Sequence, residues 1–379
     1  MAIWPAGSSS PIKLPTSAAV RARLPKECQV PEILSEQGYS TFATGKWHNG
    51  PKLFARSFQS GDSIFFGGMS DHDKVPVNAF DPSGRYPKES ISTGAKFSSE
   101  LFSDAAIGFL ENHKSADPFF CYVAYTAPHD PRMAPKQFTD LYDPEKIKLP
   151  PNFLPQHPFD NGELKVRDEM LAPHPRTEKE IRQHIAAYYA MISEVDHHIG
   201  RILRVLDETG LAKNTYVFFA GDNGLAVGQH GLLGKQNPYD HSWRVPLVIR
   251  GPGIAAGKRL TGLRYMHDLN ATIYDVTRTP VPPTVEMKSL LDRRHDRDRV
   301  FFAYRHFQRA VRDQRWKLVL YHVNGQETVR LYDLSRDPWE TTPVNDARRI
   351  AHYRALLHQE MRAVDDPLDI TKPNWGKPE

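Results

Sequence analysis

Residues 118–125, Pro-Phe-Phe-Cys-Tyr-Val-Ala-Tyr, form an unbroken apolar run. A run of this kind, with no alternating polar positions, is typical of a strand buried on both faces of a parallel sheet. The segment before it, residues 98–114, carries apolar side chains at helical intervals. A helix that leads into a doubly buried strand predicts an α/β domain with helices on both sides of its sheet.

The clearest helical pattern covers residues 177–209. Thr177 and Glu180 predict a capping box at its start, and Gly210 ends it. A second apolar strand, residues 215–220, follows directly, so helix and strand alternate again. Three histidines lie on or beside this helix, and we expect them on its surface rather than bound to a metal: His184, His197 and His198.

The C-terminal part has a different pattern. Residues 309–338 predict antiparallel strands turned near residues 313–315 and 324–326, and residues 346–363 predict a last helix. Residues 244–253 predict one more buried strand, whereas the Pro-rich residues 131–176 predict a long loop. Three units are expected. Residues 1–29 are an atypical N-terminal segment, and residues 30–283 form an α/β domain with a mostly parallel central sheet. Residues 284–379 form a small C-terminal antiparallel sheet with a helix.

Composition narrows the class of protein. The chain has 379 residues, of which 40% are hydrophobic and 25% charged, and its formal net charge is +4, which indicates a globular protein with a sizeable core. Lys and Arg form no block of the kind that follows nucleic acid, so we expect no nucleic-acid partner. We also expect no membrane span, because no stretch approaches roughly 18 consecutive apolar residues. A small anionic substrate fits the slightly basic balance.

Three predicted strand ends carry polar side chains. Lys46 and His48 follow a predicted strand at residues 39–44, His129 follows the apolar run at residues 118–125, and Asp222 and Asn223 follow the strand at residues 215–220. In an open parallel sheet the ligand lies outside the carboxyl ends of the strands, so we expect these five side chains near one another.

These residue types have complementary chemistry. Asp222 and Asn223 offer the oxygen ligands that Ca²⁺ prefers, although Asp-Asn-Gly is also a common turn sequence. Lys46 offers positive charge to an anion, and His48 and His129 can move protons near neutral pH, with solvent-facing loop histidines as the equal alternative. Lys235 lies in a Gly-rich loop that lacks the spacing of a phosphate-binding loop.

Four segments, in this order, resemble the sulfatase family, in its bacterial arylsulfatase-like branch of the alkaline phosphatase superfamily. They are residues 38–50, 119–131, 218–253 and 309–340. The similarity extends from about residue 30 to about residue 365. It implies an alkaline phosphatase-like fold and a sulfuric ester hydrolase that acts on a small sulfated substrate, such as an aryl or sugar sulfate.

Carried over by position, the resemblance implies a role for each strand-end residue. Asp222 and Asn223 would bind Ca²⁺, and Lys46 and Lys235 would hold the sulfate oxygens. His129 would donate a proton to the leaving alcohol. Negative charge that develops on these oxygens is stabilised best by fixed cations and a metal.

The resemblance also gives His48 a role, in the breakdown of a covalent sulfate intermediate. His230 and Arg244 are candidate substrate contacts, with surface salt bridging as an equal alternative. The Pro-rich segment 131–176 and the C-terminal unit are the expected readers of the alcohol part of the ester.

Two family features are missing from the sequence. Sulfatases carry a Cys-x-Pro-Ser-Arg type motif, whose cysteine is oxidised to formylglycine, and an acidic metal-binding pair on the first strand. Neither is present, and neither Cys28 nor Cys121 stands in the motif. We therefore expect this polypeptide to hydrolyse sulfate esters poorly or not at all.

Two interpretations of that gap stay open. In the favoured one, the chain is truncated or frame-shifted, and residues 1–28 stand where the nucleophile segment belongs. The retained catalytic set favours it, since a lineage without catalysis has no reason to keep the set. In the other interpretation, the chain is a non-catalytic homologue that binds sulfated ligands.

A phosphodiesterase or phosphomonoesterase of the same superfamily is a further alternative. Such an enzyme would need two transition metals, with ligands among His230, Asp240, His241, His267 and Asp268. The family is often periplasmic or secreted, but no signal peptide is visible here. Neither location nor oligomeric state is predicted.

Overall fold

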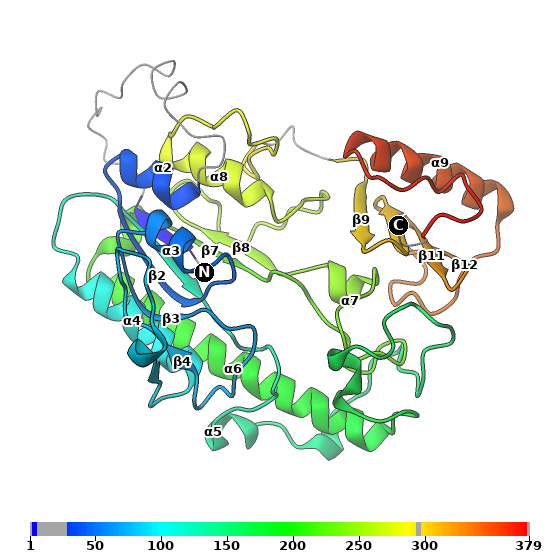
Figure 1. Ribbon diagram of the computed structural model, residues 1–379, viewed down its shortest axis with the longest axis horizontal. Coiled ribbons are helices and arrows are strands. Elements are labelled where there is room, and N and C mark those ends of the chain that lie inside the picture. The colour runs from blue at the N-terminus through cyan, green and yellow to red at the C-terminus, as the bar shows by residue number, and fades with distance from the viewer. Residues whose placement is uncertain (1, 6–28, 293–296, 377–379) are drawn as a thin grey trace.

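The computed structural model describes residues 2–5, 29–292 and 297–376 (Figure 1). Its larger sheet has the strand order β3-β2-β6-β1-β7-β8. The strands are β1 (Ala2–Pro5), β2 (Ser40–Lys46), β3 (Ser60–Phe65), β6 (Phe119–Ala124), β7 (Thr215–Ala220) and β8 (Leu247–Arg250). β2 pairs parallel with β3 and β6, and β1 lies antiparallel between β6 and β7. Four strands therefore run in one direction, which confirms the predicted mostly parallel sheet.

Helices cover both faces of this sheet (Figure 1). They are α2 (Val30–Glu36), α3 (Pro51–Ser57), α4 (Ser98–Asn112), α6 (Glu178–Glu208) and α8 (Asp268–Thr277). α4 and α6 bury one face with Phe119, Cys121 and Val123 of β6. α2, α3 and α8 bury the other face with Phe120. Because successive strand residues point to opposite faces, the unbroken apolar run of β6 fills both cores.

Two strands differ from the sequence prediction. Residues 2–5, in the segment that the sequence marked only as atypical, form β1, because the backbones of β6 and β7 supply hydrogen-bonding partners on both sides. β8 is an edge strand, antiparallel to β7, with half-buried and exposed residues in alternation. Val248 on β8 is 58% exposed, so the prediction of a fully buried strand at residues 244–253 was wrong.

The C-terminal unit matches its prediction. β9 (Val300–Tyr304), β10 (Gln308–Arg312), β11 (Trp316–Val323) and β12 (Gln326–Asp333) form an antiparallel sheet in the order β12-β11-β10-β9. α9 (Ala347–Ala363) packs on it through Tyr353, Leu357 and Met361. Asp346 caps this helix by accepting a hydrogen bond from Arg349 N–H at 2.9 Å.

Helix α6 has the predicted capping box of Thr177 and Glu180. One of its histidines departs from expectation: His198 is buried, its Nε2 lies 3.5 Å from Glu194 Oε1, and burial lowers its pKa to about 4. It faces inward because α5 and α4 pack against this stretch of α6. Among the described residues no helix is both long and apolar enough to cross a membrane.

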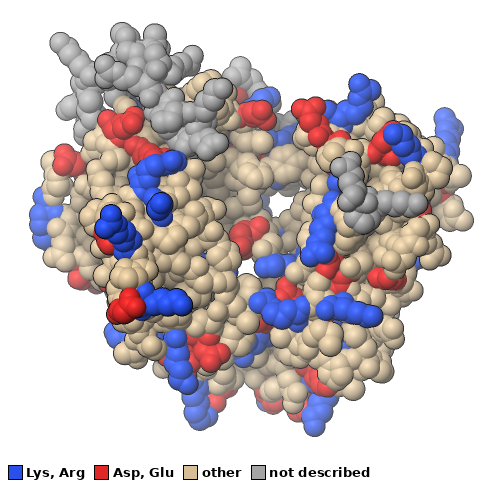
Figure 2. Space-filling view, in the orientation of Figure 1, with Lys and Arg blue, Asp and Glu red and all other residues tan. Residues whose placement is uncertain are grey.

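The remaining elements are short. They are β4 (Pro76–Val77), β5 (Ser92–Thr93), α5 (Lys136–Thr139), α7 (Asp240–Trp243) and the 3-10 helices Lys88–Ser90, Pro144–Lys146, Arg167–Leu171 and Leu211–Asn214. Most of the Pro-rich segment is therefore irregular, as predicted. On the face drawn in Figure 2, positive and negative side chains are interspersed, in line with the absence of a Lys/Arg block in the sequence.

Candidate active site

The end of β2 places Lys46 and His48 beside the loop at Gly68. Trp47 N–H donates to Phe65 O at 2.8 Å, which ties the chain to β3 as it leaves the sheet. Lys46 Nζ donates to Gly68 O at 2.7 Å. A Cβ at Gly68 would lie 3.5 Å from His48 Nε2, so the exposed His48 imidazole lies against the same residue. The two strand-end residues thus meet at one loop position.

His129 follows β6, and both its backbone carbonyl and its imidazole ring form hydrogen bonds. Its Nδ1 lies 3.0 Å from Asp130 O, a carbonyl that only accepts, so Nδ1 carries a hydrogen and Nε2 is left for substrate. His72 donates from Nε2 to His129 O at 2.9 Å and accepts from Ser98 Oγ at its Nδ1 at 2.8 Å. Burial lowers the pKa of His72, which keeps it neutral in this arrangement. Sequence patterns did not single out His72.

Asp222 and Asn223 leave β7 in a tight, exposed turn. Asn223 N–H donates to Asp222 Oδ1 at 2.8 Å, and Asn223 Nδ2 donates to Gly224 O at 2.9 Å. A Cβ at Gly224 would lie 2.0 Å from His241 O. Only glycine permits this approach, which docks the turn against α7 (Asp240–Trp243).

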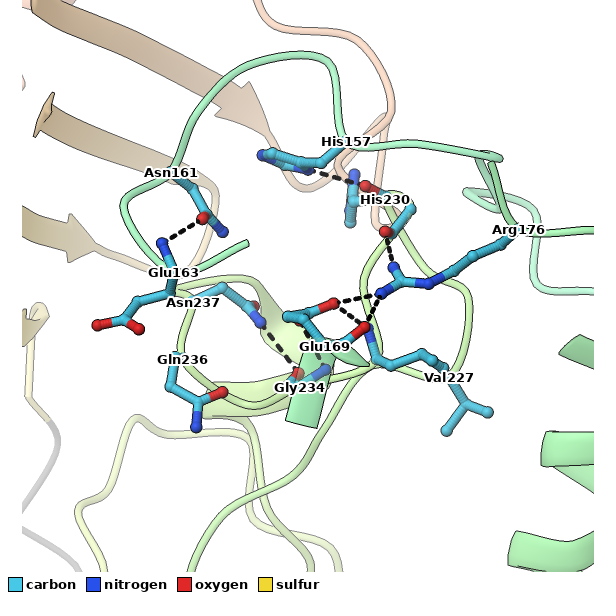
Figure 3. Close-up of polar contacts among 12 residues, drawn as sticks. His157, Asn161, Glu163, Glu169, Arg176, Val227, His230, Gly234, Gln236 and Asn237 are labelled. Carbon is cyan, nitrogen blue, oxygen red and sulfur yellow. Dashed lines mark hydrogen bonds and ion pairs between the residues drawn. The ribbon is translucent and has the colours of Figure 1, made fainter. Parts of the chain in front are cut away.

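The loop that carries Lys235 is held by a buried ion pair (Figure 3). The Glu169 carboxylate accepts hydrogen bonds from Leu233 N–H at 2.8 Å and Gly234 N–H at 2.7 Å. Arg176 Nη2 donates to the same carboxylate at 2.7 Å, and Arg176 Nη1 donates to a carbonyl of the loop at Gly231. Both charged side chains are buried. Hydrogen bonds from this ion pair therefore hold the backbone at Gly231, Leu233 and Gly234, directly before Lys235.

Charged side chains surround Lys46. Burial and the nearby charge of Lys235 lower the pKa of Lys46, Asp222 opposes this shift, and Arg167 adds to it. Such electrostatic interactions weaken with distance, so these groups lie near one another. Lys235, Asp222 and Arg167 therefore all lie within electrostatic reach of Lys46. Of these, Arg167 was not among the residues named from the sequence.

Arg167 is held by its neighbour. Its Nε donates to Asp168 Oδ1 at 2.9 Å, and Asp168 Oδ2 accepts from Gln236 Nε2 at 2.8 Å. Burial alone would raise the pKa of Asp168, but the hydrogen bonds from Gln236 and Arg167 outweigh it and the pKa is lowered. Asp168 therefore stays ionised and links the Arg167 segment to the residue after Lys235.

Comparisons with known proteins identify the family. A family model described as Sulfatase matches residues 9–279, and one described as N-sulphoglucosamine sulphohydrolase, C-terminal, matches residues 228–366. The first match covers well over half of the chain. The chain belongs to the sulfatase family.

Individual relatives fit this assignment. An arylsulfatase of Clostridium perfringens is 28% identical over 277 residues, which cover 69% of this chain and 57% of the relative. A choline-sulfatase of Rhizobium meliloti is 27% identical over 423 residues, 94% of this chain and 80% of the relative. BT4656, solved in complex with its substrate D-glucosamine-2-N, 6-O-disulfate, has a TM-score of 0.74 at 21% identity over 90% of this chain and 83% of that chain. The chain thus spans little more than half of the arylsulfatase, and the solved structure shows the fold alone.

Two candidate substrate contacts behave differently from the main set. His230 is buried, stacks on Tyr239 at 3.8 Å between ring centroids and lies with Nε2 3.0 Å from Asn152 Nδ2. Burial lowers its pKa to about 3. The ring is therefore packed within the protein, and the role of His230 as a substrate contact stays a prediction. Arg244 is exposed next to α7, and its role stays a prediction.

The cysteines do not supply the family's nucleophile among the described residues. Cys121 is fully buried in β6, and burial raises its pKa to about 12. Its thiol is therefore neither ionised nor accessible. Cys28 lies outside the described residues. Cys121 is structural, as the sequence predicted.

The residues expected to bind calcium do not make a complete site. Ca²⁺ takes about six to eight oxygen ligands, and Asp222 with Asn223 supplies one carboxylate and one amide. No group of three or more His, Cys, Asp or Glu side chains that could hold a metal occurs in the part of the chain that the structure describes. The described donors therefore do not fit a resident Ca²⁺.

The residues considered as ligands for two transition metals do not form a metal site among the described residues either. Asp268 is ion-paired with Arg297 Nη1 at 2.5 Å, and Asp240 is paired with Lys317 Nζ at 2.7 Å. His241 is half-buried, and burial lowers its pKa well below the ordinary value. These side chains hold the structure together and are not collected around one point.

Proposed function

We propose that this chain binds sulfate esters at the strand ends and that this site acts as a sulfuric ester hydrolase site. The observation that carries the proposal is that the charges of Lys235 and Arg167 both act on Lys46, with Asp222 as the carboxylate that opposes them. A site with this surplus of fixed positive charge favours an anionic group. The family assignment selects a sulfate ester among anions.

The histidines complete the proposed chemistry. His129 presents Nε2 outward, because its Nδ1 hydrogen is used by Asp130 O. In its protonated form this nitrogen donates to the leaving alcohol oxygen, which would otherwise depart as a costly alkoxide. His48 is exposed beside Gly68, where it can move a proton to or from water. Both roles are proposals for this chain.

We further propose that the 379-residue polypeptide turns over sulfate esters slowly or not at all. The sequence has no Cys-x-Pro-Ser-Arg motif from which formylglycine could form, and Cys121 is buried with a strongly raised pKa. Calcium, proposed for the family's chemistry, would add positive charge at the sulfate, but Asp222 and Asn223 alone do not hold it. Binding without rapid cleavage is therefore the expected behaviour.

The test separates binding from turnover. Isothermal titration of the purified chain with 4-nitrophenyl sulfate should show binding, and Lys46→Ala or Lys235→Ala should weaken it by about tenfold or more, as loss of a charged hydrogen-bond partner does. The exposed Lys179 on α6 gives the matched control Lys179→Ala, which should bind unchanged. Release of 4-nitrophenol should stay near the uncatalysed rate. Equal binding by all four proteins would refute the site, and fast release would refute the slow turnover.

A further inference from the structure

Arg132 is a buried cation that no part of the site described above uses. Its side chain is 5% exposed, and its Nε lies 3.1 Å from Asp130 Oδ1 without the alignment of a hydrogen bond. Nη1 and Nη2 have no hydrogen-bond partner among the described residues. Buried donors in proteins are nearly always paired, and a charged donor is the most costly to leave unpaired.

Other buried arginines of this chain behave as expected. Arg176 donates to Gly231 O, Glu169 O and the Glu169 carboxylate. Arg309 donates to both carboxylate oxygens of Asp366, at 2.6 Å and 3.1 Å, and to two backbone carbonyls. In both, Nη1 and Nη2 are matched by the fold itself, although Arg176 Nε has no hydrogen-bond partner among the described residues. Arg132 differs, so its partner is to be sought outside the described chain.

The position of Arg132 puts it at the active-site end of β6. It lies three residues after His129, on the same strand-end loop, and His129 is held in place by His72. On the other side lies helix α6, whose half-buried His184 and Tyr188 interact electrostatically with Arg132. Tyr188 also interacts with Asp222. Arg132 therefore lies between the proton-donor loop and the helix that borders the strand ends.

The groups around Arg132 leave its two outer nitrogens available. Burial and, to a smaller extent, the charge of Arg132 lower the pKa of His184 to about 4. Burial raises the pKa of Tyr188. Both are neutral near neutral pH, so Asp130 is the negative group that faces the guanidinium, and Arg176 adds repulsion. A planar guanidinium with two unpaired N–H groups matches an oxyanion in bidentate geometry.

We propose that Arg132 binds a second anionic group of the substrate, a carboxylate or a second sulfate, carried on the alcohol part of the ester. This inference rests on the proposed function, since it takes the first sulfate to bind at Lys46 and Lys235. It narrows the substrate class to sulfate esters with a second oxyanion, such as sulfated acidic sugars. Asp130 positions the guanidinium from the Nε side.

Three methyl glycosides test the proposal by isothermal titration: a glucoside monosulfate, the corresponding disulfate and the sulfated glucuronide. The unmodified chain should bind the disulfate or the glucuronide at least about tenfold tighter than the monosulfate, the gain that a charge-assisted pair supplies. Preference for one of the two doubly anionic ligands would identify the second group as sulfate or carboxylate.

Variants assign that preference to the residue. Arg132→Gln should abolish the gain and leave monosulfate binding unchanged, and Arg132→Lys should retain part of it, because lysine keeps the charge but loses the fork. Arg336 is 82% exposed in the C-terminal unit, so Arg336→Gln is the matched control. A thermal melt of each variant shows that it is folded.

The results distinguish the proposed role of Arg132 from the proposed function. Monosulfate binding with no gain for either doubly anionic ligand overturns the role of Arg132 and leaves the proposed function standing, and this result needs no variant. A gain that survives in Arg132→Gln overturns the role as well. Failure of all three ligands to bind the unmodified chain overturns this inference, and the proposed function is overturned with it only if 4-nitrophenyl sulfate fails to bind as well.

Discussion

Glu169 accepts a hydrogen bond from Gly234 N–H at 2.7 Å, one residue before Lys235 in the chain. Glu169 is 3% exposed, and its carboxylate is paired with Arg176. It thereby fixes a loop whose own sequence is flexible, since Gly231 and Gly234 flank two leucines. Glu169 therefore holds the Lys235 loop in place, although its own carboxylate is not one of the groups proposed to contact the ligand.

Replacing this carboxylate should damage stability and binding together. In Glu169→Gln the amide group turns an N–H toward other donors and leaves Arg176 buried without its counter-charge. Removal of one partner of a buried ion pair costs about 3–5 kcal/mol, so urea unfolding should show a loss of this size. Affinity for 4-nitrophenyl sulfate should fall as well, because Lys235 is no longer held.

A surface pair provides the comparison. Glu178 is 65% exposed and pairs with Arg182 at 3.3 Å, and exposed pairs contribute about 0–1 kcal/mol. Glu178→Gln should therefore leave both the unfolding free energy and the affinity nearly unchanged. If Glu169→Gln behaves like this control, Glu169 does not anchor the loop.

The pKa of Lys46 should set the alkaline limit of ligand binding. Burial and Lys235 lower this pKa from its ordinary 10.5, so Lys46 loses its charge at a lower pH than a free lysine does. Affinity for 4-nitrophenyl sulfate should decline as pH rises through this lowered value. NMR of ¹³C-methylated lysines would follow the titration of Lys46 directly.

Lys235→Ala offers a check on that interpretation. Removal of the neighbouring cation should raise the pKa of Lys46, so the alkaline decline moves to higher pH even though the overall affinity is weaker. Lys179→Ala should leave the titration of Lys46 in place. A Lys46 resonance that titrates like a free lysine in the unmodified chain would contradict the crowded site.

The sequence predicted the strand ends because their signal is local. Lys46 and Asp222 each follow an apolar strand, and parallel strands bring such residues to one edge. Arg167 and Glu169 escaped notice because they lie in the Pro-rich segment, which has no periodicity. The Arg-Asp-Glu triplet at residues 167–169 is a weak signal there, since charged triplets are common in loops.

Two environments could not be predicted for a common physical reason. His230 was named as a substrate contact with surface salt bridging as the alternative, and β8 was expected to be buried, because a sequence shows residue types but not what packs beside them. Tyr239 covers the ring of His230, and β8 has a described strand on one side only. Long-range contacts of this kind decide burial, and no local pattern contains them.

Cys121 should be unreactive in the folded protein. Its pKa is raised to about 12 by burial, so thiolate is scarce at neutral pH and the sulfur is out of reach of reagents. The variant Cys28→Ser removes the other cysteine of the chain. This variant should not react with Ellman's reagent when folded and should release one equivalent of chromophore after unfolding in guanidinium chloride. Rapid reaction of the folded variant would show that β6 is open.

Lys317 should be a determinant of stability with a distinct pH dependence. It is fully buried on β11, and its Nζ lies 2.7 Å from Asp240 Oδ1 and 2.6 Å from Glu340 Oε1. Burial raises the pKa of Asp240, but the charges of Lys317 and Arg312 outweigh it and lower the value to about 2. Because this pKa is below that of the unfolded chain, Asp240 stabilises the fold above about pH 4. That stabilisation is lost as the pH falls through about 2.

Lys317→Met should reverse that dependence. Without the ammonium group, the pKa values of both carboxylates rise, and holding them ionised in the folded state becomes unfavourable. The loss of unfolding free energy, about 3–5 kcal/mol for a broken buried pair, should therefore be larger at pH 8 than at pH 5. Urea unfolding at the two values measures it. Lys372 is 70% exposed and pairs with Asp369 at 3.6 Å, so Lys372→Met should change little at either pH. A penalty for Lys317→Met that is the same at both pH values would mean that the two carboxylates are not what Lys317 holds in place.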